Sequence, residues 1–297
     1  MDERDWLAER FEEHRTHLRA VAYRMLGSLS EADDAVQEAW IRLSRSDADE
    51  IDNLRAWLTT VVARLSLNTL RSRSRRREEP MDLRMPEPIV DPVDGTDPEH
   101  EAILADSLGL ALLVVLETLS PPERLAFVLH DMFGIRFEEI AAILDRSPQA
   151  ARQLANRARK KVRAERTEPD PDLDAQREIV DAFLAAAREG DFERLVAVLD
   201  PDVVSRGDFG PGVPLREARG AEAVASNAIM FQRIGLEARP ALVNGAVGAV
   251  SLRDGKPFSI GALTVSNGKI VELDFFADPE RLAKIDLTAF EGQEATR

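Results

Sequence analysis

Residues 147–163 read Ser-Pro-Gln-Ala-Ala-Arg-Gln-Leu-Ala-Asn-Arg-Ala-Arg-Lys-Lys-Val-Arg, and this segment has the strongest structural signal in the chain. Ser147 can accept hydrogen bonds from the first turn of a helix, and Pro148 suits the first helical position because it has no N–H. At about 100° per residue, one narrow stripe is apolar. Its members are Ala151, Leu154, Ala155, Ala158 and Val162. The opposite face presents amides and cations: Gln149, Gln153, Asn156 and Lys160, flanked by Arg152, Arg157 and Arg163.

Amides and cations are the groups that contact DNA bases and phosphates, but an ordinary surface helix would also have a charged face. The residues upstream decide between a DNA-binding helix and an ordinary surface helix. Ser120-Pro121-Pro122-Glu123 is a capping-box start for one helix, and Gly134 interrupts the chain after it. Residues 137–144 then predict a short amphipathic helix, and Asp145-Arg146 a tight turn into the segment above. This order is typical of a helix-turn-helix, whose second helix enters the DNA major groove.

The composition limits the class of protein. The chain has 297 residues, 44% hydrophobic and 31% charged, which fits two or three globular domains. It has no cysteine, which excludes disulfides and thiolate metal sites and fits a reducing cytoplasm. The first residues are acidic and lack the apolar core of a signal peptide, and the apolar run at 108–116 is too short to cross a bilayer. We therefore expect a cytoplasmic protein without membrane contact.

The charge is unevenly distributed along the chain. The net charge is −15, and residues 167–297 hold 14 Lys and Arg against 23 Asp and Glu. Five arginines lie between positions 71 and 77, and seven Lys or Arg between positions 152 and 166. Local basic clusters on an acidic protein indicate contact with nucleic acid at defined places.

Residues 2–76 show helical spacing and no strand-like alternation. The first helix is expected to end at Gly27, and Ser30 to cap the second. A polar loop over residues 46–52 leads into a third helix, which continues into the run of arginines. The second helix leaves five polar side chains on its outer face: Asp33, Asp34, Gln37, Glu38 and Arg42.

Residues 78–100 have the composition of a linker. Prolines recur among acidic residues, as in a stiff extended segment, and a disordered spacer fits the same composition. The stretch Met85-Pro86-Glu87-Pro88-Ile89-Val90 can dock on another surface, because apolar residues flank its prolines.

The pattern changes again after a short linker at 168–171. The spacing of Ile179, Phe183 and Ala187 predicts a helix ended by Gly190, and Asp191 caps the next helix. Apolar runs then predict strands over 242–252, 258–265 and 270–276, separated by turns at 253–256 and 267–268. A last helix starts near Asp278. Helices followed by a curved antiparallel sheet indicate an α+β domain, so the expected fold is multidomain, with two all-α domains before the α+β domain.

Two motif blocks resemble bacterial sigma factors of the extracytoplasmic-function group, a branch of the sigma-70 family. Residues 24–28, 31–38 and 53–58 match region 2 of that family; residues 119–124 and the helix-turn-helix match region 4. The rest is similar to a SnoaL-like domain, a cone-shaped α+β fold. The combination resembles the SigJ-type subgroup, in which that domain is fused to the sigma factor. The implied segments are a region 2 domain (1–77), a Pro-rich linker (78–105), a region 4 domain (106–166), a short linker (167–174) and a SnoaL-like regulatory domain (175–297).

The resemblance implies a protein without catalytic residues, metal or cofactor, which binds core RNA polymerase and directs it to the −10 and −35 elements of promoter DNA. The outer face of the second helix (Asp33, Asp34, Gln37, Glu38 and Arg42) is expected to dock on the polymerase. The residues expected to read the −10 element are Asn53, Arg55, Asn68 and Arg71. The loop at 46–52 is the candidate pocket for an unpaired base, and the arginine run supplies cations for the phosphates.

The residues expected to read the −35 element lie on the helix quoted first. Arginine can fork onto guanine, and glutamine or asparagine onto adenine. They are Gln149, Arg152, Gln153, Asn156, Arg157 and Lys160. Of these, Lys160 is expected on the DNA backbone, together with Lys161 and Arg163.

The resemblance also implies regulation in cis. Pro86, Glu87 and Pro88 are similar to a proline motif in the subgroup's linker, and residues 277–282 resemble a C-terminal regulatory motif that includes Asp278, Pro279, Arg281 and Leu282. A glycine-rich aspartate loop is matched loosely by Gly207-Asp208-Phe209-Gly210. The acidic domain is expected to contact the sigma regions or the linker of its own chain and to set their spacing.

A different class of function fits the same sequence: a cone-fold small-molecule-binding domain, or an isomerase- or cyclase-type enzyme, fused to a DNA-binding module. Cone folds can hold a small apolar ligand and can use an aspartate as general base. Asp208 and Asp274 are the candidates, and neither lies in a recognisable partner motif. Tyr23, the sole tyrosine, lies outside the domain, which excludes a tyrosine-based oxyanion hole there. We expect no catalysis, with room for a small-molecule ligand in the cone.

Overall fold

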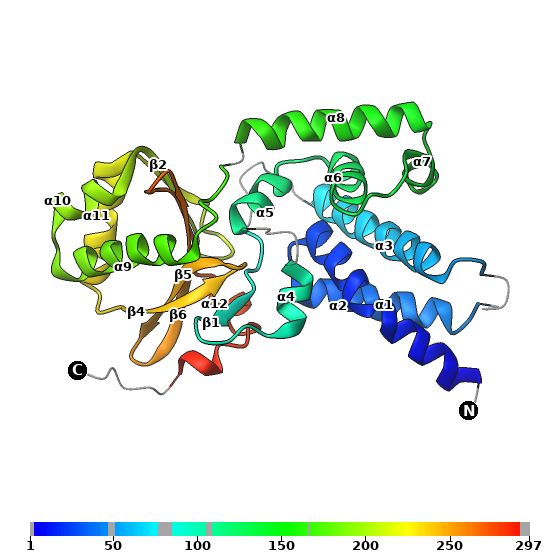
Figure 1. Cartoon of the computed structure of the whole chain (residues 1–297), viewed down its shortest axis with the longest axis horizontal. Coiled ribbons are helices and arrows are strands. Elements are labelled where there is room, and N and C mark those ends of the chain that lie inside the picture. The colour runs from blue at the N-terminus through cyan, green and yellow to red at the C-terminus, as the bar shows by residue number, and fades with distance from the viewer. Residues whose placement is uncertain (1–2, 47–50, 77–84, 105–108, 166, 292–297) are drawn as a thin grey trace. The chain divides into compact units, whose positions relative to one another are not determined.

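The structure is a computed structural model of the whole chain. It describes every residue except 1–2, 47–50, 77–84, 105–108, 166 and 292–297 (Figure 1). The chain divides into two compact units. Unit 1 comprises residues 1–80, 98–106 and 113–165, and unit 2 comprises residues 81–97, 107–112 and 166–297. The boundaries predicted after residues 77, 105 and 166 all fall on residues outside the described ranges.

The described part of unit 1 is helical (Figure 1). Its elements are α1 (Glu3–Leu26), α2 (Leu29–Leu43), α3 (Leu54–Arg76), α4 (Pro98–Leu104), α6 (Pro121–Phe127), the π-helical turn η2 (Val128–Met132), α7 (Phe137–Leu144) and α8 (Pro148–Glu165); α5 (Leu110–Glu117) has residues in both units. No described helix is both long and apolar enough to cross a lipid bilayer.

The helix starts and stops of unit 1 follow mostly from short-range chemistry. Gly27 ends α1 as predicted, with a left-handed φ of 67°. The predicted cap at Ser30 was wrong: Ser28 caps α2, because its hydroxyl accepts from the Glu31 backbone N–H. The capping box at Ser120 and Glu123 is confirmed, since Ser120 N and Oγ both donate to Glu123 Oε2.

Unit 2 combines a seven-stranded sheet with helices. The strands are β1 (Val90–Pro92), β2 (Leu199–Asp208), β3 (Arg216–Arg219), β4 (Glu237–Val243), β5 (Ala246–Arg253), β6 (Lys256–Ser266) and β7 (Lys269–Phe276). The sheet order is β1-β4-β5-β6-β7-β2-β3. The helices are α9 (Leu173–Glu189), α10 (Phe192–Val198), α11 (Ala221–Gln232), α12 (Pro279–Leu282) and the 3₁₀ turn η3 (Thr288–Phe290). The side chains of α9, α10 and α11 pack with the sheet into one apolar core that includes Phe183, Leu195, Val224 and Leu273.

Three features of the sheet differ from the prediction. The run at 242–252 is two strands, because Asn244 and Gly245 both adopt positive φ and turn the chain between β4 and β5. The predicted antiparallel pairing holds among the described strands except between β2 and β7, which pair in parallel. Strands β2 and β3 and helix α11 were not predicted, since residues 199–232 mix charged residues and glycines with short apolar runs. The turns at Asp254-Gly255 and Asn267-Gly268 are confirmed.

Candidate nucleic-acid interface and linker clamp

The predicted helix-turn-helix is present as α7, a three-residue turn and α8. Asp145 adopts a left-handed conformation (φ 54°) at the end of α7, and the Ser147 hydroxyl accepts from Ala150 N at 3.2 Å to start α8. The buried side chains of α8 are those of the predicted apolar stripe: Ala151, Leu154, Ala155, Ala158 and Val162. One face of α8 therefore holds the domain together, and the other is available to a partner.

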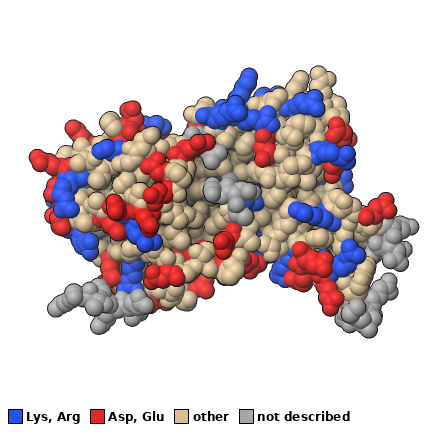
Figure 2. All heavy atoms as spheres, viewed as in Figure 1, with Lys and Arg blue, Asp and Glu red and all other residues tan. Residues whose placement is uncertain are grey.

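The outer face of α8 carries the six side chains predicted for the −35 element, and all of them are exposed. Lys and Arg side chains gather over α8 at the top of the view in Figure 2. Within the described part of the chain, Gln149, Gln153 and Lys160 have no side-chain partner. Arg157 contacts Glu123 at 2.9 Å, and its hydrogen bond, together with those from Ser120, lowers the pKa of Glu123 against the opposing effect of burial.

Three further contacts show which cations of this helix are already engaged. The Arg152 guanidinium lies over the Phe137 ring of α7, 5.2 Å from its centroid. Arg159 is held by Asp131 at 2.7 Å. Lys161 donates to the Thr118 carbonyl oxygen at 2.9 Å, so the side chain expected on the DNA backbone has a partner within the domain.

The four residues predicted for the −10 element lie at two separate places on α3. Asn53 and Arg55 are at its start, where Asn53 Oδ1 accepts from Ala56 N at 3.0 Å, and Asn68 and Arg71 are exposed near its end. At about 1.5 Å per residue, Asn53 and Asn68 are about 22 Å apart along the helix, which is too far for one base pocket.

The neighbouring basic and loop residues are described only in part. Arg73 is directed inward, contacting Glu31 and donating to the Leu26 carbonyl at 3.0 Å. Arg75 is exposed, whereas the Arg76 side chain, Arg77 and most of the predicted pocket loop (47–50) lie outside the description.

The face predicted to dock on the polymerase is formed by α2. Asp34, Gln37 and Arg42 are exposed, and Arg42 bonds Glu38 at 2.9 Å within the helix. Asp33 is half-buried and bonds Arg19 of α1 at 2.6 Å. This face is an ordered polar surface, with Asp33 contributing at its edge.

The predicted docking of the linker stretch is confirmed within unit 2. Every residue from Met85 to Asp91 is buried, and β1 extends the sheet by pairing antiparallel with β4. Asn244 fixes the register from the β4–β5 turn: its Oδ1 accepts from Ile89 N at 3.0 Å, and its backbone N–H donates to Ile89 O at 2.8 Å. Prolines suit an edge position, because they have no N–H that would need an acceptor in the ladder.

The start of the docked stretch is held by Arg281. Its Nη2 donates to the Met85 carbonyl at 2.8 Å, its Nε to Glu87 Oε1 at 3.2 Å and its Nη1 to Asp208 Oδ2 at 3.2 Å. Asp208 Oδ2 also accepts from Met85 N at 2.9 Å. Asp278 caps α12 by accepting from the Glu280 and Arg281 backbone N–H groups, which places Arg281 for these contacts. We call Asp208, Arg281 and Asp278 the linker clamp.

The loosely matched segment 207–210 belongs to this clamp. A side chain at Gly207 would collide with the Phe209 ring at 2.8 Å, so glycine lets that ring fold back on its own strand. Gly210 has a φ of 95°, and a Cβ there would lie 3.2 Å from the Asp278 carboxylate. Gly210 N donates to Asp208 Oδ1 at 3.1 Å. Six of the eight predicted regulatory residues lie in the docked stretch or the clamp: Pro86, Glu87, Pro88, Asp208, Asp278 and Arg281. The other two belong to α12, where Pro279 is exposed and Leu282 is buried.

The two aspartates considered as general bases serve other contacts. Asp208 is engaged in the clamp. Asp274 is fully buried beside Arg206, with Oδ1 accepting from Arg206 Nη1 at 3.1 Å. Burial raises the pKa of Asp274 to about 6; Arg206 opposes this shift, and Glu272 adds to it. Neither aspartate is among the residues that line the cone cavity.

Asn244 is the site residue that sequence reasoning missed. Asn244-Gly245 is a hairpin signal inside an apolar run. Recognising this turn would have identified the Asn244 side chain as a candidate partner for a docked strand.

Comparisons with known proteins agree with these two parts. The model of sigma-70 region 2 matches residues 10–76, and that of sigma-70 region 4 matches residues 109–162. The chain is 42% identical over 291 residues to the ECF RNA polymerase sigma factor SigJ of Mycobacterium tuberculosis, covering 91% of each protein. It is 34% identical over 293 residues to the probable ECF RNA polymerase sigma factor SigI of the same organism, covering 95% of this chain and 97% of that protein.

Structural comparison extends the likeness beyond the helical regions. The crystal structure of the M. tuberculosis extracytoplasmic function sigma factor SigJ matches with a TM-score of 0.77 at 39% identity, and the match covers 94% of this chain and 99% of that one.

Proposed function

The chain belongs to the extracytoplasmic-function sigma factors of the sigma-70 family, which direct RNA polymerase to promoters, and from this premise we propose that its fused C-terminal domain regulates promoter use by holding the linker between regions 2 and 4. The linker clamp is the means: it binds a stretch of chain that lies between the two promoter-reading regions in sequence.

The surfaces described above have separate roles in this proposal. The exposed face of α8 reads the −35 element, Asn53 and Arg55 contribute to −10 recognition at one end of α3, and Asn68 and Arg71 at the other. The outer face of α2 binds core polymerase in the cytoplasm. The C-terminal domain binds and positions without catalysis, which is supported by the engagement of Asp208 and Asp274 in other contacts.

The single observation that carries the proposal is the burial of residues 85–91. Burying Met85, Ile89 and Val90 contributes about 1.5–3 kcal/mol for each side chain. Ordering seven backbone residues costs about 1–2 kcal/mol for each residue, a sum of similar size. The hydrogen bonds of the clamp and of Asn244 therefore decide whether the stretch is docked, as a reversible regulatory contact requires.

Docking reduces the part of the linker that is free to move between regions 2 and 4. An extended chain spans about 3.3–3.6 Å per residue, so the seven docked residues account for up to about 23–25 Å of linker whose course is fixed on the domain. Only the linker residues on either side of the docked stretch can then change the separation of regions 2 and 4, which is how the domain sets their spacing.

The test is reconstituted transcription with core polymerase, using a template pool randomised at the −10 and −35 elements. Arg281→Ala removes two donors to the docked stretch and one to Asp208, so it should raise amide exchange at Ile89 and change both transcript yield and promoter choice. Arg253→Ala, at an exposed turn of the same domain, is the matched control. A chain lacking residues 170–297 should show the same change more strongly.

Either of two results would contradict the proposal. One is faster exchange at Ile89 in Arg281→Ala with transcription identical to the control. The other is unchanged transcription by the truncated chain.

A further inference from the structure

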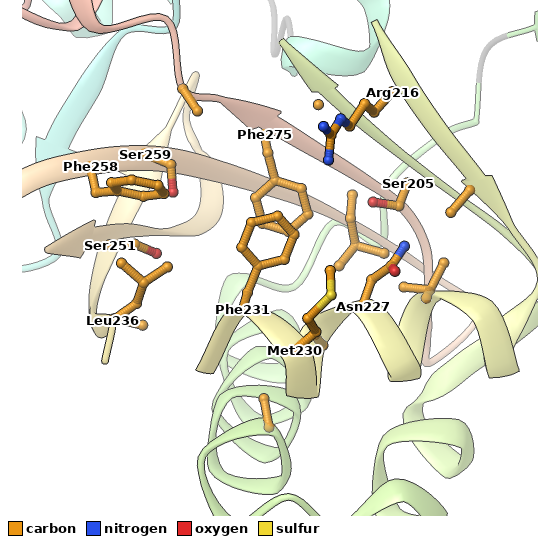
Figure 3. Close-up of a pocket in the computed structure, with 18 of the residues that line it drawn as sticks. Ser205, Arg216, Asn227, Met230, Phe231, Leu236, Ser251, Phe258, Ser259 and Phe275 are labelled. Atoms are coloured by element: carbon orange, nitrogen blue, oxygen red, sulfur yellow. The ribbon is translucent and has the colours of Figure 1, made fainter. Parts of the chain in front are cut away.

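The C-terminal domain encloses a cavity of about 360 Å³ between α9, α11 and the concave face of the sheet (Figure 3). This volume is within the range of about 300–1,000 Å³ typical of small-molecule pockets. Its middle is aromatic: Phe231 of α11 and Phe275 of β7 face each other with ring centroids 6.4 Å apart, and Phe209 stacks parallel to Phe231 at 6.3 Å. The lining is mainly apolar, so a ligand with a flat apolar body fits it.

Glycines and small residues create this space. A Cβ at Gly261 would lie 3.2 Å from the Phe275 ring, and Gly207 makes room for Phe209 in the same way. Ala218 and Ala238 line the cavity where larger side chains would fill it. The sheet thus keeps a hollow beneath α11 instead of a closed core.

One end of the cavity is polar and cationic. Figure 3 shows Arg216, Ser205 and Asn227 together at that end, with the Arg216 guanidinium directed toward the cavity. Arg216 lies over the Phe209 ring, 5.3 Å from its centroid. Glu217 is the carboxylate among the lining residues, and it bonds Arg219 at 2.7 Å, so it does not neutralise Arg216.

We propose that this cavity binds a small aromatic carboxylate, with its ring system against the Phe231 and Phe275 pair and its carboxylate at Arg216, Ser205 and Asn227. A guanidinium with a hydroxyl and an amide beside it is a donor set for a carboxylate. The apolar remainder of the lining excludes strongly hydrated anions, whose desolvation it would not compensate.

The cavity and the linker clamp share a wall, so ligand binding reaches the regulation proposed above, and this part rests on that proposed function. Gly207 and Phe209 line the cavity, while Asp208, between them, binds Met85 N and Arg281. Ala277 also lines the cavity, and its N–H donates to the Asp208 carbonyl at 2.8 Å. A ligand that orders Phe209 and Phe275 therefore stabilises the strand ends that hold Asp208, and strengthens linker docking.

The binding test uses 2-naphthoate and its neutral isostere 2-naphthamide, titrated calorimetrically into the full chain. Loss of a charge-assisted contact should weaken 2-naphthoate binding roughly tenfold in Arg216→Gln while leaving 2-naphthamide unchanged. Arg219→Gln, on the same strand, is the matched control and should bind as the wild type does. Ala228→Trp, which fills the cavity from α11, should abolish binding of both compounds.

Absence of 2-naphthoate binding to the wild type, or equal weakening by Arg216→Gln and Arg219→Gln, overturns the site. The coupling between ligand binding and linker docking is measured separately, as the rate of amide exchange at Met85 and Ile89. Saturating 2-naphthoate should slow this exchange in the wild type but not in Ala228→Trp. Binding without slower exchange overturns the coupling and leaves the cavity site standing. Because neither readout uses transcription, failure of the linker-spacing proposal is seen independently, in the Arg281→Ala assay.

Discussion

Arg124 Nε donates to the backbone carbonyl of Arg24 over 3.2 Å, across 100 residues of sequence. The Arg124 side chain is only 2% exposed, and its Nη1 contacts Glu117 Oε1 at 2.5 Å. Arg24 in turn lies over the Phe133 ring, 4.7 Å from its centroid. Arg24 belongs to the region 2 match and Arg124 to the region 4 match, so a buried polar contact joins the two regions within unit 1.

We predict that Glu117→Gln destabilises unit 1 and loosens this contact. Removing one partner of a buried ion pair leaves the other charge uncompensated, at a cost of about 3–5 kcal/mol. Urea unfolding followed by tryptophan fluorescence is a suitable measurement, because Trp6, Trp40 and Trp57 all lie in unit 1. Glu12→Gln, which breaks an exposed pair with Arg15, is the control and should change stability by less than about 1 kcal/mol. Equal effects of the two variants would contradict the prediction.

The exposed face of α8 predicts two kinds of DNA-binding variant. Gln153→Ala and Arg152→Ala should change which −35 sequences are bound, because their side chains lie early on the helix, where base edges are reached. The expected loss at the preferred base is about 1–3 kcal/mol. Lys160→Ala should weaken all promoters alike and reduce the salt dependence of binding.

Binding selection on randomised DNA at several salt concentrations separates these two kinds of variant. Lys161→Ala is a useful comparison, because this lysine already donates to the Thr118 carbonyl and its loss should affect the stability of the helix packing. Uniform losses for Gln153→Ala, Arg152→Ala and Lys160→Ala would refute the assignment.

The outer face of α2 predicts a loss of polymerase binding when positive charge is introduced there. Asp34→Lys together with Gln37→Lys leaves the buried side of the helix untouched and changes an exposed polar surface, so the fold should persist. Affinity for core polymerase, measured by fluorescence anisotropy, should fall roughly tenfold or more, because two positive charges replace part of the acidic and polar surface proposed to bind it. Glu9→Lys, at an exposed site on α1, is the control, and a matching loss there would remove α2 from the interface.

The helical part was predictable because its signals are local. Caps such as Ser147 and the periodic stripe of α8 depend on residues within a few positions of each other, and the structure has them as predicted, apart from the two-residue shift of the α2 cap from Ser30 to Ser28. The clamp was predictable only as a set of residues. Arg281 and Met85 are 196 residues apart, so their hydrogen bond leaves no periodic trace in the sequence. Strand β2 was missed for a related reason, since its parallel partner β7 is distant and its own residues include Asp202, Arg206 and Asp208.

A half-buried histidine in unit 1 and a buried aspartate in unit 2 predict opposite responses of the two units to acid. In unit 1, burial and the neighbouring Arg55 guanidinium lower the pKa of His17 from 6.5 to about 4. Arg55 donates toward Nδ1 at 3.3 Å and Thr59 Oγ1 lies 3.2 Å from Nε2, so the neutral ring fits this site. Between pH 6.5 and about 4 the unfolded chain binds more protons at His17 than the folded one, so this residue's contribution to stability is lost as the pH falls.

In unit 2 the change of stability with pH has the opposite sign. Burial raises the pKa of Asp274 from 3.8 to about 6, so the folded state binds more protons there than the unfolded chain, and Asp274 favours folding increasingly as the pH falls from about 6 toward 4. Relative to His17→Gln, the wild type should therefore lose stability from pH 7 to pH 4.5, and relative to Asp274→Asn it should gain. Thermal unfolding of the three proteins at matched ionic strength measures both differences, and a pH-independent difference for either variant would show that its group does not titrate in this range.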